Sequence, residues 1–311
     1  MVVPSSGGAP PVPPISPYGT LQGSLFCYDA NKAAFESVPS GSSEPLPSKK
    51  CILVGGLSDG LMPTPYTQDL EKECHKLGWS FVMPILSSSY LGFGNGDLER
   101  DSQEISALMW YLTCHRSAET FALVGHSTGC QNAVHFSKHG QADMVQKTKV
   151  IALQAPVSDR EEAVWETSKY DTYLEIANKL KEEGKELEMM PRAAFWAPIT
   201  AQRYLGLHAK GGADDFFSSD WTDEELVDRL GHMSNVSDRK VLVAFSGADE
   251  YVPKQLDCKR MSERLCKAIN GGKEEGVSVE CFLPNANHNL SEAEGDKEKF
   301  AQKVAEYLRN L

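Results

Sequence analysis

The stretch Phe121-Ala-Leu-Val-Gly125-His-Ser127-Thr-Gly129-Cys130 decides how this chain folds. Its first four residues form a short, continuous apolar run, which is typical of a strand buried on both faces. The next five match G-x-S-x-G and lead directly into a helical pattern that starts at Cys130. Such a match is weak by itself, and a chance Gly/Ser turn is the alternative. The strand–turn–helix context, however, is typical of a nucleophile elbow, in which a sharp turn exposes a serine hydroxyl.

Strands and helices alternate on both sides of this stretch. Apolar residues recur at helical spacing between the strands, as in the last helix, where Phe300, Val304 and Leu308 share one face. Repeated strand–helix units indicate an α/β fold with a mostly parallel central sheet and helices on both faces. Further buried strands are expected at residues 51–54, 79–86, 150–153, 241–245 and 277–283.

The rest of the chain divides into a tail, a core and an insertion. Residues 1–17 are rich in proline and predict a flexible tail. Residues 157–236 interrupt the strand–helix rhythm with charged helical sequence. An insertion at the C-terminal edge of a sheet is where a lid sits. We therefore expect one α/β core at 18–156 and 237–311, with an inserted cap at 157–236.

Composition excludes several classes of function. The 311 residues include 31 Lys plus Arg and 43 Asp plus Glu, so the formal net charge is −12. This charge argues against binding nucleic acid or an anionic membrane surface. No apolar run reaches the roughly 20 residues of a membrane-spanning helix. The eight cysteines form no C-x-x-C pair and the N-terminus lacks an apolar signal segment, so we expect reduced thiols and a cytoplasmic protein.

A base and an orienting acid for Ser127 follow it in the order that this fold requires, Ser, then Asp or Glu, then His. Asp249 comes directly after the expected strand at 241–245, and His288 lies in the loop after the strand at 277–283. The nearest rival acid is Glu250, and a turn-capping role is the alternative for Asp249. We expect Ser127, Asp249 and His288 to form a catalytic triad, with His288 as the base and Asp249 as the acid that orients it.

The oxyanion formed by attack of a serine needs two backbone N–H donors. One is expected from Thr128, the residue after the nucleophile. The other should come from the glycine-rich loop after the strand at 51–54, where we choose Leu57 and keep Gly56 as the alternative. This chemistry needs no metal and no organic cofactor.

With these motifs the chain resembles the α/β-hydrolase superfamily. More narrowly, it resembles a fungal and plant family that includes the fungal fusarinine C esterases, which cut the ornithine esters of a hydroxamate siderophore. The resemblance implies an esterase with Ser127, Asp249 and His288 in the matching positions, and a small-molecule ester, such as a ferric siderophore, as its substrate. The stretches that carry it are residues 55–66, 123–132, 197–204, 214–220, 246–253 and 287–292.

Two aspartates in the expected cap offer a possible contact to such a substrate. Fusarinine C carries free amines, and Asp214 and Asp215, next to Phe216 and Phe217, would suit it if they formed an acidic, aromatic rim. Solvated acids beside core phenylalanines are the alternative. For the whole protein, the alternatives are a generic carboxylesterase, a thioesterase or an acyltransferase, and a non-catalytic ligand receptor on the same fold.

Overall fold

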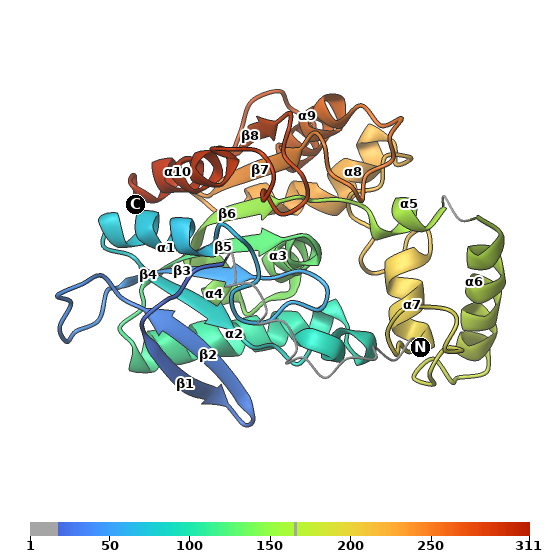
Figure 1. The fold of residues 1–311 in the computed structure, drawn as a ribbon, viewed down its shortest axis with the longest axis horizontal. Coiled ribbons are helices and arrows are strands. Elements are labelled where there is room, and N and C mark those ends of the chain that lie inside the picture. The colour runs from blue at the N-terminus through green and yellow to red at the C-terminus, as the bar shows by residue number, and fades with distance from the viewer. Residues whose placement is uncertain (1–17, 165–166) are drawn as a thin grey trace, which may run out of the picture.

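The described part of the protein, residues 18–164 and 167–311 of a computed structural model, is built around one eight-stranded sheet (Figure 1). The expected tail at 1–17 lies outside these residues. The strand order across the sheet is β1-β2-β4-β3-β5-β6-β7-β8. The strands are β1 (Ser24–Asp29), β2 (Lys32–Ser37), β3 (Lys49–Val54), β4 (Ser80–Pro84), β5 (Thr120–His126), β6 (Thr148–Gln154), β7 (Lys240–Ser246) and β8 (Ser278–Leu283).

The sheet is mostly parallel, as the alternation of strands and helices predicts. Only the N-terminal edge differs: β1 and β2 form an antiparallel hairpin, and β2 pairs antiparallel with β4. All remaining neighbours pair in parallel. The carboxyl ends of β3, β5, β6, β7 and β8 therefore meet at one edge, where loops from distant parts of the sequence come together.

Helices cover both faces of this sheet. Helices α2, α3 and α9 share one apolar cluster with residues such as Ile52 and Leu123, and α1 and α10 share another with the alternating residues Leu53 and Val124. The two clusters explain why the central strands are apolar on both faces. The helices around the sheet are α1 (Thr67–Lys76), α2 (Leu98–His115), α3 (Thr128–His139), α4 (Ala142–Lys147), α9 (Cys258–Ile269) and α10 (Asp296–Leu308), with a 3₁₀ helix, η1, at Tyr90–Asn95.

The segment between β6 and β7 is helical. It holds α5 (Asp159–Val164), α6 (Thr167–Glu182), α7 (Ala201–His208), α8 (Asp223–Leu230) and the 3₁₀ helix η2 (Gly231–Asn235). Helices α6 and α7 pack around their own apolar cluster, and Figure 1 shows them beyond the end toward which β6 points. Within the described ranges, no helix combines the length and apolar character needed to span a lipid bilayer.

Candidate active site

Ser127 occupies a strained turn between β5 and α3. Its φ is +53° and its ψ is −124°, a backbone conformation that residues other than glycine rarely adopt. The flanking glycines are required by space. A Cβ on Gly125 would lie 2.2 Å from the carbonyl oxygen of Gly129, and one on Gly129 would lie 2.4 Å from that of Val54. The G-x-S-x-G pattern thus reflects close backbone packing around an outward-pointing serine.

His288 and Asp249 meet behind this turn. They lie in the loops that follow β8 and β7, and His288 Nδ1 is 2.8 Å from Asp249 Oδ2. The Asp249 side chain is fully buried, so the carboxylate fixes the imidazole from its protein-facing side. Glu250, the rival acid, accepts the backbone N–H of His288 at 2.9 Å and so positions the loop rather than the ring.

Ser127 and His288 line one pocket of about 790 Å³ at the carboxyl edge of the sheet. Within the described residues Ser127 Oγ makes no hydrogen bond with the imidazole, a looser arrangement that is common before substrate binds. The pocket volume lies in the upper part of the range typical for small-molecule sites. A serine hydroxyl and an imidazole that contacts a buried carboxylate therefore share a cavity large enough for a bulky ligand.

The loop after β3 approaches the nucleophile closely. A Cβ on Gly56 would lie 2.7 Å from the Cβ of Ser127, so only glycine fits there. The N–H of Gly56 donates to Asp59 Oδ2 at 2.7 Å, whereas the N–H of Leu57 has no acceptor among the described residues. Burial raises the pKa of Asp59, and the Gly56 N–H and the nearby His288 act in the opposite direction. Of the two expected oxyanion donors in this loop, Leu57 is thus the one whose amide remains available.

A polar network beneath the site was not predicted. Gln154, at the end of β6, accepts hydrogen bonds through Oε1 from Tyr66 and from His126 Nδ1, at 3.0 and 2.6 Å. Its Nε2 donates to the backbone carbonyl of His288 at 2.9 Å. Burial lowers the pKa of His126 to about 3, helped by the neighbouring His288, so its imidazole stays neutral. The network holds the loop that carries His288 against the centre of the sheet. The only sequence signal for it is a polar residue, Gln154, at the end of a buried strand.

The far wall of the pocket comes from the segment between β6 and β7. Aromatic rings dominate this wall, and His208 at the end of α7 is enclosed by three of them. Its ring centroid lies 4.6 Å from that of Tyr204, 5.4 Å from Tyr170 and 5.5 Å from Phe195. Burial lowers the pKa of His208 to about 4, with Arg203 acting in the same direction and the backbone of Asp159 opposing it.

The buried imidazole of His208 predicts an acid-sensitive fold. The unfolded chain binds a proton at His208 below about pH 6.5 and the folded chain only below about pH 4, so stability falls as the pH drops through that window. This difference is worth about 2 kcal/mol between pH 7 and pH 5. His208→Phe should reduce the loss of unfolding free energy over this interval by that amount, as measured by urea unfolding. If the unfolding free energy falls equally in wild type and in the variant, His208 is not the group responsible. Between pH 7 and pH 8, the unfolding free energies of the two proteins should change by the same amount.

Asp214 and Asp215 are buried and do not form the exposed acidic rim that the sequence suggests. Arg203 Nη1 contacts both carboxylate oxygens of Asp214 at 2.6 and 2.7 Å, and this aspartate side chain is 1% exposed. Asp215 is fully buried and accepts a hydrogen bond from Arg160 Nε at 3.0 Å. Neither aspartate lines the pocket. Both carboxylates are neutralised by arginines inside the segment between β6 and β7, a pairing that the local sequence around them did not indicate.

The chain is similar to known proteins over most of its length. A family model described as a protein of unknown function (DUF1749) matches residues 12–309. A UPF0613 protein of Schizosaccharomyces pombe is 30% identical, over 86% of this chain and 90% of its own length. The fusarinine C esterase sidJ of Aspergillus fumigatus is 28% identical, over 95% of this chain and 98% of its own. Among solved structures, the siderophore hydrolase EstB of Aspergillus fumigatus superimposes with a TM-score of 0.78 at 27% identity, covering 95% of this chain and 99% of that one.

Proposed function

The chain belongs to the family described as a protein of unknown function (DUF1749), and on that premise we propose that it is a serine esterase acting on a hydroxamate siderophore of the fusarinine C type. The observation that carries the esterase assignment is the strained Ser127 turn, which shares one pocket with an imidazole held by a buried carboxylate. Relatives named as esterases, over nearly the full length of this chain, support the same chemistry.

The reaction follows from the roles of three side chains. Ser127 Oγ attacks the ester carbonyl carbon while His288 Nε2 takes the hydroxyl proton, and Asp249 holds the imidazole through Nδ1. The backbone N–H groups of Thr128 and Leu57 stabilise the oxyanion. His288 then gives its proton to the leaving alkoxide, which departs as an alcohol. Water, deprotonated by His288, attacks the acyl-enzyme carbonyl carbon, the bond to Ser127 Oγ breaks, and His288 returns the proton to Ser127 Oγ as the acid leaves.

The substrate class rests on the relatives and on the shape of the pocket. One relative is named a fusarinine C esterase and one structural neighbour a siderophore hydrolase. The pocket of about 790 Å³ is lined by rings such as Tyr170, Tyr173 and Trp196, which suit a large, partly apolar ligand. The helical segment at 157–236 supplies these rings, and we include in the proposal that it acts as a cap over the substrate.

A cytoplasmic location belongs to the same proposal. All eight cysteines are unpaired thiols, and four of them are buried (Cys51, Cys74, Cys130 and Cys281). Unpaired thiols in this number are typical of proteins that work in a reducing compartment.

The proposal is tested by incubating the protein with ferric fusarinine C and with its acetylated form, followed by mass spectrometry. We expect the wild type to add one water for each ester bond cleaved, and Ser127→Ala to leave both compounds intact. Cleavage of simple aryl esters without cleavage of either siderophore would reject the substrate class and leave the esterase assignment standing.

The same assay separates the alternative functions. An acyltransferase would pass the acyl group to an added alcohol and yield a new ester in place of the acid. A ligand receptor would bind the siderophore without any change in its mass, and a fluorophosphonate probe would then leave Ser127 unlabelled.

A further inference from the structure

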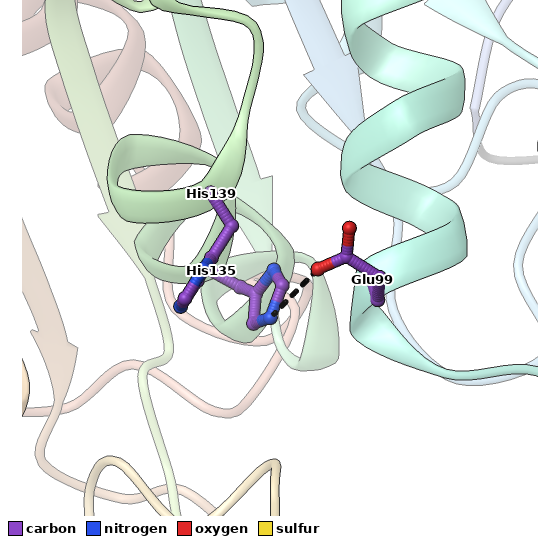
Figure 2. A group of neighbouring side chains, drawn as sticks. All are labelled: Glu99, His135 and His139. Carbon is purple, nitrogen blue, oxygen red and sulfur yellow. Dashed lines mark ion pairs between the residues drawn. The ribbon is translucent and has the colours of Figure 1, made fainter.

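Three side chains outside the pocket form a cluster whose chemistry the esterase reaction does not use. Figure 2 shows Glu99 on the first turn of α2 facing His135 on α3, with His139 one helical turn further along α3. A separation of four residues places two side chains on the same face of a helix. Glu99 and His139 are exposed and His135 is partly buried, so an ion can reach the cluster from solvent.

The ligand atoms are close to the spacing that a metal ion requires. His135 Nε2 lies 4.0 Å from Glu99 Oε2, and one ligand atom from each of the three residues lies within 4.8 Å of the other two. Around a tetrahedral zinc ion, with bonds of about 2.0–2.2 Å, neighbouring ligand atoms are roughly 3.3–3.5 Å apart. The ligand atoms must therefore move closer together by about 1 Å, and the side chains of Glu99 and His139 are exposed and free to rotate toward His135.

Two neighbouring residues already orient the ligands. Ser102 Oγ lies 2.8 Å from His135 Nδ1, which leaves Nε2 of that ring directed at Glu99. Gln103 Nε2 donates to Glu99 Oε1 at 3.0 Å, which leaves Oε2 directed at His135. Hydrogen bonds to the distal atoms of metal ligands are typical of metal sites because they fix ring and carboxylate orientation.

We propose that Glu99, His135 and His139 bind a divalent transition-metal ion that links α2 to α3. Two imidazole nitrogens and one carboxylate oxygen suit Zn²⁺, Co²⁺, Ni²⁺ or Cu²⁺, whereas Mg²⁺ and Ca²⁺ require sets of oxygen ligands. The remaining coordination positions go to water. None of the three ligands lines the catalytic pocket, so the ion acts on the helix pair, and α3 begins at the Ser127 turn.

Titration of the full-length, chelator-treated protein with Zn²⁺ in a calorimeter tests this site. The background carries Cys27→Ser and Cys114→Ser, because these two exposed thiols would otherwise compete for zinc. We expect one site, at least 10-fold weaker in His139→Ala and in His135→Ala and several-fold weaker in Glu99→Gln. His115→Ala, which changes a histidine of α2 outside the cluster, should bind zinc as the background protein does, and Mg²⁺ should not bind.

Thermal unfolding gives a second, independent readout. Zinc should raise the Tm of the background protein and leave that of His139→Ala unchanged, and His139 is exposed, so its replacement does not disturb the fold. Co²⁺ should give a visible d–d absorption band that is lost in the same variant. Unchanged zinc affinity in His139→Ala, or a zinc-induced Tm shift that survives this substitution, would overturn the proposal.

Discussion

Replacing Ser127 with alanine is expected to abolish ester hydrolysis, lowering kcat/KM by about 10⁴-fold or more. The reason is positional, because the strained turn at φ +53° presents this hydroxyl at the pocket that His288 also lines. Without Oγ no acyl-enzyme forms, and the imidazole–carboxylate pair has no nucleophile to activate. The measurement is kcat/KM on an aryl ester together with covalent labelling by a fluorophosphonate probe.

A matched control is available in the same pocket. Ser158 also lines it, but its Oγ is 2.6 Å from Ser218 Oγ and its backbone does not have the positive φ of the Ser127 turn. Ser158→Ala should therefore keep full labelling. The circular dichroism spectrum of Ser127→Ala should match that of wild type, since Ala155 shows that alanine is accommodated at positive φ elsewhere in this fold. Labelling that persists in Ser127→Ala would contradict the assignment of the nucleophile.

The fold and the juxtaposition of Ser127, Asp249 and His288 at one edge of the sheet could be predicted from local patterns for a physical reason. Strand β5, the Ser127 turn and helix α3 are consecutive, so steric rules confined to a few residues define them. The two proposed partners of Ser127, Asp249 and His288, follow strands whose carboxyl ends meet at one edge of a parallel sheet, so their order along the chain carries information about their place in space. Asp249 follows such a strand, β7, and this position singles it out from most other acids of the chain as the candidate partner of the imidazole.

The contacts missed by sequence reasoning join residues that no local pattern relates. Gln154 donates a hydrogen bond to the carbonyl of His288, which lies 134 residues later in the sequence. No pattern in the residues around Gln154 predicts that bond. Glu250 was considered as a rival acid, but only the structure shows that it binds the backbone N–H next to the ring that Asp249 holds. The aspartates are visible in the sequence at 211–220, but the arginines that neutralise them lie outside this stretch. Arg160, for example, is 55 residues away from Asp215.

The second large effect is expected from one of those aspartates, through stability rather than through catalysis. Asp214→Asn removes the carboxylate in contact with Arg203, whose side chain is only 7% exposed, and leaves its buried guanidinium charge with only Asp159 and Asp101 as opposing charges. Breaking a buried ion pair on one side costs about 3–5 kcal/mol. We expect the unfolding midpoint in urea to fall accordingly. Glu183→Gln, which breaks an exposed ion pair with Lys185, should leave the midpoint unchanged.

A double variant separates the loss of charge balance from the loss of shape. Arg203→Met combined with Asp214→Leu removes both charges, so it should recover most of the stability that Asp214→Asn loses. Activity gives a further test, at a temperature where wild type and Asp214→Asn are both folded. If Asp214 acts only through Arg203, both proteins should show the same ratio of kcat/KM on amine-bearing siderophore to kcat/KM on acetylated siderophore. A midpoint that does not move, together with a selective loss of activity on the amine-bearing substrate, would instead mean that this carboxylate meets the substrate. Asp214 would then be exposed to the pocket in the working enzyme, and the buried pair with Arg203 would describe only its resting state.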